Sequence, residues 1–275
     1  MPRTPPPGPA VAPVGITVLS DPARENDVVA DVCFVHGLGG GPYKTWFRAN
    51  AINPETQQQA SSPSALKKLF VKKSKASSPQ VDASKVECYW PKDLVAQDFE
   101  NVRVLTYGYD SHPSKFFTGK TNKMTISQHA QQFLDAITNV RDECRGRPII
   151  FVVHSLGGIL VKDAILTSLK YEYQPSLRDL GQSCQSIVFF GTPHLGADAA
   201  AYGDIAAGFV GALGMSVYRE VLHGLKPDGE VLMRINIDFN DILNRNIPPE
   251  QKMQIFSFQE GMGITSIGKL DKKVS

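Results

Sequence analysis

One segment in the middle of the chain constrains the fold most, because it predicts a strand, a sharp turn and a helix in immediate succession. Residues 148–153 form an apolar, β-branched run, and residues 154–158 (HSLGG) turn from it into a second apolar stretch. Such a turn exposes the hydroxyl of Ser155, while the helix N-terminus directs N–H groups and a positive dipole at developing negative charge. Gly157 lets the helix pass close to a neighbouring strand. The pattern predicts a nucleophile elbow, with the Leu156 N–H as an oxyanion donor.

The elbow pattern departs from the usual G-x-S-x-G form at one position, where Val153 replaces the first small residue. A β-branched side chain there is expected to crowd the turn. Under the alternative interpretation, the segment is a buried strand with a glycine-rich turn, and Ser155 only caps the following helix. The motif alone leaves both interpretations open.

A second glycine-rich loop supports the catalytic interpretation. Residues 28–35 predict a central strand, which ends in residues 36–41 (HGLGGG). Glycines let such a loop approach a substrate oxygen, and the Leu38 N–H is its candidate oxyanion donor. A dinucleotide-binding loop is the competing interpretation, but the spacing is not G-x-G-x-x-G and no acidic residue follows a second strand at the expected place. His36 is expected to anchor the loop rather than to act as a base.

Strand and helix signals alternate along the chain. Strands are expected at residues 14–19, 28–35, 101–109, 148–153, 186–191 and 253–258. Helices are expected from a capping box at 125–128, after the elbow as far as 169, and around 232–242. This order predicts an α/β fold with a mostly parallel sheet and helices on both faces. Sites in such sheets form at the carboxyl ends of strands, where Leu38, Ser155 and Glu260 fall.

Composition limits the domain count and the classes of partner. The 275 residues, 42% hydrophobic and 20% charged, fit one domain at residues 26–275 after a disordered, proline-rich N-terminus at residues 1–25. A net charge of +2 is too small for an electrostatic potential that would favour nucleic-acid binding. Four scattered cysteines without C-x-x-C spacing indicate reduced thiols in an intracellular, cytoplasmic protein and no metal site. No cofactor is expected, no run is long enough to span a membrane, and the oligomeric state stays open.

Two segments interrupt the alternation. Residues 55–84 are rich in Gln, Ser, Pro and Lys. A solvated, low-complexity loop is the first interpretation, and a peripheral contact with an anionic membrane surface is the second. Residues 197–225 are rich in Ala and Gly. They are expected to form a cap over the pocket, and their small side chains would face an acyl chain or pack as core.

Several stretches in consistent order resemble a eukaryotic family of lipase-like serine hydrolases in the α/β-hydrolase superfamily. Besides the two glycine-rich motifs, they lie at residues 90–94, 103–110, 187–194 and 256–260. The chain is similar to the serine-active-site-containing protein and to the N-terminal hydrolase domains of fungal NACHT, NB-ARC, ankyrin and tetratricopeptide receptor-like proteins. The resemblance implies a serine esterase acting on carboxylic esters, lipids among them, with mitochondrial or endoplasmic reticulum membrane association. It also implies that the C-terminal strand and helix of the fold are missing from this chain.

The catalytic triad is incomplete in this sequence. The order expected in this fold is serine, acid, histidine. Glu260 matches the acid position by resemblance, and Asp198 is the runner-up. No histidine follows Glu260, and the histidine of the family lies after a further strand that this chain does not contain. His223, on the expected cap, is the remaining candidate for the base.

Two classes of function therefore stay open. One is an acyl hydrolase in which Ser155 attacks a small-molecule or lipid ester, the Leu38 and Leu156 N–H groups hold the oxyanion, and Glu260 orients a histidine. The other is a non-catalytic signalling or docking module, or an inactive truncated fragment, which the missing histidine favours. Weak or absent turnover and an exposed sheet edge at residues 255–258 are expected of the chain as given.

Overall fold

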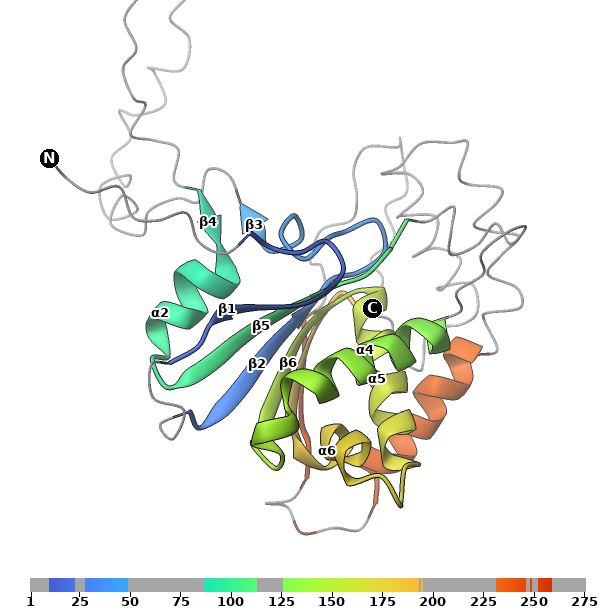
Figure 1. Cartoon of the computed structure of the whole chain (residues 1–275). Coiled ribbons are helices and arrows are strands. Elements are labelled where there is room, and N and C mark those ends of the chain that lie inside the picture. Colours follow the sequence, from blue (N-terminus) through green and yellow to red (C-terminus); the bar gives the residue numbers. More distant parts are fainter. Residues whose placement is uncertain are drawn as a thin grey trace, which may run out of the picture.

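The computed structural model describes residues 10–22, 28–48, 87–112, 126–192, 194, 231–245, 248 and 252–258 (Figure 1). Several predictions fall outside these residues. They are the insert at 55–84, the cap at 197–225, the start of the capping box at Thr125, and the candidates Asp198, His223 and Glu260.

A six-stranded sheet forms the centre of the described domain (Figure 1). The strand order is β1-β5-β2-β6-β7-β8, with β1 antiparallel to β5 and the other neighbours parallel. The strands are β1 (Gly15–Ser20), β2 (Ala30–Val35), β5 (Val102–Gly108), β6 (Ile149–His154), β7 (Cys184–Phe190) and β8 (Gln254–Phe258). A separate two-stranded ladder joins β3 (Phe47–Arg48) to β4 (Cys88–Tyr89). The six predicted strands and the mostly parallel sheet are confirmed.

The position of β1 corrects the predicted N-terminal boundary. β1 pairs with β5 from Gly15 opposite Gly108 to Ser20 opposite Val104. Because residues 15–20 belong to the sheet, the domain begins before residue 26.

Helices cover both faces of the sheet. One face carries α4 (Ile126–Val140), α5 (Leu156–Leu169), α6 (Pro175–Ser183) and a helix at residues 231–243, which share one apolar core. Figure 1 shows α4, α5 and α6 gathered on one side, with α2 apart from them. The other face carries a second core, in which Phe34 and Trp46 pack with residues of η3 (Pro91–Val95) and α2 (Ala96–Asp98).

The apolar pattern explains which helices could be predicted. In α4, Ile126, Ala130, Phe133 and Ile137 are buried on one face, as the helical period predicts. α6 was not predicted, because its nine residues are too few to establish a period. The signal it does carry is Pro175 in its first turn, a common position for proline.

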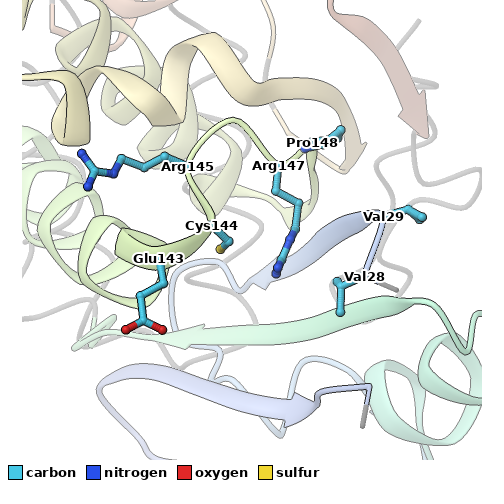
Figure 2. Close-up of a pocket in the computed structure, with 7 residues that line it drawn as sticks. All are labelled: Val28, Val29, Glu143, Cys144, Arg145, Arg147 and Pro148. Atoms are coloured by element: carbon cyan, nitrogen blue, oxygen red, sulfur yellow. The ribbon is translucent and has the colours of Figure 1, made fainter. Parts of the chain in front are cut away.

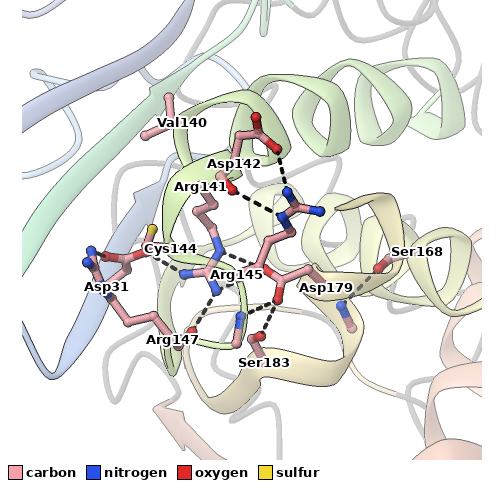
Figure 3. A network of polar contacts seen from close by, with 12 residues as sticks. Asp31, Val140, Arg141, Asp142, Cys144, Arg145, Arg147, Ser168, Asp179 and Ser183 are labelled. Carbon is pink, nitrogen blue, oxygen red and sulfur yellow. Dashed lines mark hydrogen bonds and ion pairs between the residues drawn. The ribbon is translucent and has the colours of Figure 1, made fainter. Parts of the chain in front are cut away.

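A buried ionic network lies at the amino-terminal edge of the sheet (Figure 3). Asp31 of β2 is fully buried and accepts two hydrogen bonds from Arg103, both 2.9 Å long. It also pairs with Arg141 and, at 3.3 Å, with Arg147. Figure 3 shows Arg141 reaching a second carboxylate, Asp179, whose Oδ2 lies 3.0 Å from its guanidinium. The two buried carboxylates thus pair with three arginines.

A pocket of about 530 Å³ lies beside this network (Figure 2). Its lining residues are Val28, Val29, Glu143, Cys144, Arg145, Arg147 and Pro148. Val29 precedes β2 and Pro148 precedes β6, so the pocket faces the amino ends of the strands. Sites in parallel sheets form at the opposite edge. Its arginines are also engaged, since Arg147 pairs with Asp31 and Arg145 with Asp142. The pocket is therefore no candidate for a catalytic site.

The four cysteines are free thiols in two different environments. Burial raises the pKa of Cys33 and Cys184 well above the usual range, so these thiols stay protonated and unreactive. Cys88 and Cys144 are half-buried. We expect a maleimide to modify Cys88 and Cys144 in the native protein, and all four cysteines after denaturation, as measured by mass spectrometry. Labelling of Cys33 under native conditions would contradict the buried position of β2.

The described sheet ends at β8, as expected for an exposed edge. β8 pairs with β7, and no second neighbour is present in the described part of the chain. Phe256 and Phe258 are 51% and 55% exposed. Ile255 is half-buried, so the exposure predicted for residues 255–258 is found only for the side chains of residues 256–258.

Candidate active site

Ser155 lies at the carboxyl end of β6, and its backbone is strained. Its φ of 52° and ψ of −127° make it the one non-glycine residue with positive φ in the described part of the chain. The Ser155 N–H donates to the Phe190 carbonyl at 2.8 Å, and the Thr192 hydroxyl donates to the Ser155 carbonyl at 3.0 Å. Strained backbone of this kind occurs at functional sites where the surrounding structure holds it in place.

The Ser155 hydroxyl does not cap the helix. Ser155 occupies the N-cap position of α5 but makes no side-chain capping bond. The turn was expected to expose this hydroxyl, but the Ser155 side chain is buried, at 1% exposure. Its Oγ has no hydrogen-bond partner among the described residues. Buried hydroxyls are normally hydrogen-bonded, so an unpaired one requires an explanation. The alternative interpretation of Ser155 as a capping residue is therefore wrong.

Val153 does not crowd the turn. It is a fully buried residue of β6, in register with Val35 of β2 and Phe189 of β7. The turn begins two residues later, at Ser155, where the positive φ falls. A β-branched side chain is favourable in a strand, which explains how the elbow accommodates this departure from the usual motif.

Glycines bring the loop, the elbow and the helix into contact. A Cβ on Gly37 would lie 2.7 Å from the Cβ of Ser155, so the 36–41 loop touches the serine directly. A Cβ on Gly157 would overlap the His36 carbonyl oxygen, and one on Gly158 would overlap the Thr192 side chain. The first turn of α5 thus packs against the His36 backbone after β2 and the Thr192 side chain after β7.

Two backbone N–H groups near Ser155, those of Leu38 and Leu156, have no acceptor among the described residues and are the predicted oxyanion donors. In the 36–41 loop, the Gly39 N–H donates to Ser111 and the Gly40 N–H to Gly37. No acceptor for the Leu38 N–H is found among the described residues. Leu156 is the first residue of α5, where N–H groups have no intrahelical acceptor. The structure thus brings Ser155, Leu38 and Leu156 to the same strand ends, as predicted.

His36 anchors the loop. Its Nδ1 lies 3.0 Å from the Gly37 carbonyl, and its Nε2 accepts the Tyr109 N–H at 3.3 Å. The Tyr109 hydroxyl donates to the His36 carbonyl at 2.9 Å, and the two rings stack at 4.4 Å. Burial lowers the pKa of His36 to about 4, so the ring is neutral at pH 7. With both ring nitrogens engaged, His36 is not available as a base for Ser155.

Thr192 and Tyr109 support the site but were not among the predicted site residues. Thr192 holds the Ser155 carbonyl, and Tyr109 holds the His36 loop. Both residues lie in stretches that carry the family resemblance, at 187–194 and 103–110. The family resemblance could therefore have pointed to these two residues, but the sequence does not show which backbone group each of them contacts.

The sheet order, the strained elbow and the loop that abuts it define the architecture. The chain has the α/β-hydrolase fold. No helix in the described residues is long and apolar enough to cross a membrane. Across the same residues, no group of three or more His, Cys, Asp or Glu side chains could hold a metal ion.

Comparison with known proteins supports part of the predicted resemblance. No protein-family model matches the chain. The chain is similar to Protein SERAC1 from Danio rerio, with 30% identity over 193 residues that cover 68% of this chain. Protein SERAC1 from Homo sapiens is 27% identical over 192 residues. The chain spans only 25% of the length of these curated relatives. They are animal proteins, and the link to fungal receptor-like proteins stays a prediction.

Among the solved structures that the chain matches, two are named as a thioesterase domain and a lipase-esterase related protein. One is the NocB thioesterase domain from the Nocardicin cluster, with a TM-score of 0.36 and 12% identity, covering 85% of this chain and 84% of that one. Another is a lipase-esterase related protein from Clostridium acetobutylicum, with a TM-score of 0.34 and 10% identity, covering 91% and 92%. The assignment of the fold rests on the strand order and the elbow described above.

Proposed function

We propose that this domain is a serine acyl hydrolase that acts on carboxylic esters, small-molecule or lipid, through Ser155. The observation that carries the proposal is the buried Ser155 hydroxyl, which has no hydrogen-bond partner among the described residues and lies on strained backbone at a helix N-terminus. Strain and an unpaired buried hydroxyl both cost stability. A structural role does not offset this cost, whereas a strand-to-helix turn with a serine on strained backbone at a helix N-terminus is the geometry of a nucleophile elbow.

The proposed reaction uses backbone groups on both sides of Ser155. The hydroxyl attacks the ester carbonyl, and the developing oxyanion accepts hydrogen bonds from the Leu38 and Leu156 N–H groups. The dipole of α5 favours the same negative charge. The base that takes the Ser155 proton returns it to the departing alkoxide, so that the alcohol leaves. The same base then activates a water, which hydrolyses the acyl-enzyme to the free acid and restores the Ser155 hydroxyl.

The remaining members of the triad are proposed from sequence alone. Glu260, two residues after the end of β8, is the proposed acid that orients a histidine, with Asp198 as runner-up. His223 is the candidate base within this chain. All three lie outside the described residues. The four free cysteines support the intracellular location predicted from the sequence.

A fluorophosphonate probe tests the proposal directly. We expect the probe to label the wild-type chain on Ser155, and labelling to be lost in Ser155→Ala because no other described serine lies at an elbow. Ser176→Ala, at a half-buried serine on α6, is the matched control and should label normally. Labelled peptides are identified by mass spectrometry.

Two outcomes would count against a hydrolase. Labelling that persists in Ser155→Ala would remove Ser155 as the nucleophile. A folded wild-type chain that does not label would instead favour the non-catalytic docking module.

A further inference from the structure

A buried lysine on the helix that follows Ser155 has no acidic partner in the described part of the chain. Lys162, on α5, is 3% exposed. Its Nζ donates to Asn236 Oδ1 at 2.6 Å and lies 3.0 Å from His194 Nδ1. It also lies over the rings of Phe189 and Phe239, at 5.1 and 5.5 Å from their centroids. No Asp or Glu oxygen in the described residues comes within 4.0 Å of it.

Burial of an unpaired cation is costly, so this arrangement requires a reason. A methionine would fill much of the same space against the two rings without that cost. The specific feature of the lysine is its donor capacity, because Nζ satisfies an amide oxygen and an imidazole nitrogen at once. The hydrogen bonds that Lys162 makes, rather than its volume, therefore account for a lysine at this position.

The contacts of Lys162 continue to the edge of the sheet. His194 follows β7, and its Nε2 lies 3.2 Å from the Ser257 hydroxyl of β8. The His194 ring also packs edge-on against Phe189, at 4.8 Å between centroids. A continuous set of contacts thus runs from α5 through the segment after β7 to the last residues of β8.

The protonation states fit this set of contacts. Burial lowers the pKa of Lys162 to about 8, so the amine is still mostly protonated at pH 7. Burial, and then the charge of Lys162, lower the pKa of His194 to about 4, so the imidazole is neutral. Neutral His194 can accept from Lys162 at Nδ1 and donate from Nε2 to Ser257.

We propose that Lys162, Asn236, His194 and Ser257 form a clasp that fixes the carboxyl end of β8 to the helix that carries the nucleophile. Lys162 is then a positioning residue. Ser257 is the penultimate residue of β8, and the proposed acid Glu260 follows three residues later in the sequence. The clasp would thereby hold the acid-bearing segment in register with Ser155. This catalytic consequence rests on the proposed function, whereas the clasp itself does not.

The main test compares Lys162→Met with Lys170→Met in the full chain. Lys170 is an exposed lysine at the C-cap of the same helix, so it controls for loss of charge. In Lys162→Met, we expect the NMR titration midpoint of His194 to move from about 4 towards its ordinary value of 6.5. We also expect the amide hydrogens of residues 256–258 to exchange at least tenfold faster. Lys170→Met should change neither.

Ser257→Ala provides a second variant that leaves the core intact. Ser257 is exposed, so its loss should not prevent folding. We expect faster amide exchange at residues 256–258 here as well, because the link between His194 and β8 is removed. Unchanged exchange in both variants, with an unchanged His194 titration in Lys162→Met, would overturn the clasp.

The positioning role has its own readout. If wild-type Ser155 reacts with the fluorophosphonate, Lys162→Met should label at least tenfold more slowly at pH 7 while remaining folded. Wild-type labelling rates in a variant whose β8 has loosened would overturn the positioning role. A wild-type chain that does not label contradicts the proposed function, and the titration and exchange measurements then still decide the clasp.

Discussion

Replacing Asp31 with alanine is expected to lower the free energy of unfolding by about 4 kcal/mol, because it leaves buried arginines without their shared carboxylate. Asp31 is fully buried and contacts Arg103, Arg141 and Arg147. Arg141 keeps Asp179, but Arg103 loses both of its charge-assisted hydrogen bonds to Asp31. A domain is typically stable by only about 5–15 kcal/mol, so the variant should be marginal.

Urea unfolding measures this effect as a fall in midpoint at constant slope. The matched control is Asp142→Ala. Asp142 pairs with Arg145 at 3.4 Å, and both side chains are more than half exposed, at 64% and 51%. Exposed pairs of this kind contribute at most about 1 kcal/mol. Equal effects of the two substitutions would show that the network at the amino-terminal edge does not stabilise the sheet.

Replacing Gly157 with alanine is expected to disrupt the elbow, at a cost of about 3 kcal/mol and a large loss of Ser155 reactivity. The added Cβ would overlap the carbonyl oxygen of His36 and crowd that of Val35. These are backbone atoms of β2 and its loop, so no side-chain rotation relieves the clash. The helix must move away from the loop, and the Leu38 and Leu156 N–H groups then separate. A displacement of about 1 Å can reduce reactivity by about 100-fold.

Thermal unfolding and the rate of fluorophosphonate labelling measure the two effects of Gly157→Ala. Gly41→Ala is the control for stability, since its Cβ would meet nothing closer than the Cβ of Lys44 at 3.9 Å. A Gly157→Ala variant as stable as Gly41→Ala would contradict the close approach of α5 to the loop after β2.

The sequence by itself determined the six strands of the sheet, the helix at 126–140 and the strand-to-helix turn at Ser155. Apolar runs predicted the six strands, and the apolar face of residues 126–140 predicted α4. Gly157 predicted that the helix passes close to a neighbouring strand, and its close approach to the carbonyls of Val35 and His36 agrees. These properties are local, because the side-chain period and the absence of a Cβ act over a few neighbouring residues.

Only the tertiary structure decided which distant groups meet. Asp31 and Arg141 are separated by 110 residues, and Lys162 and Asn236 by 74. No sequence pattern indicates that these residues pair. Charged residues do not recur with a regular spacing as apolar ones do, and which charges meet depends on the order of the strands and helices in the fold. The same holds for Thr192 and the Ser155 carbonyl. The sequence motif also left open whether Ser155 only caps the helix. The tertiary structure excluded this, because Ser155 Oγ has no hydrogen-bond partner among the described residues.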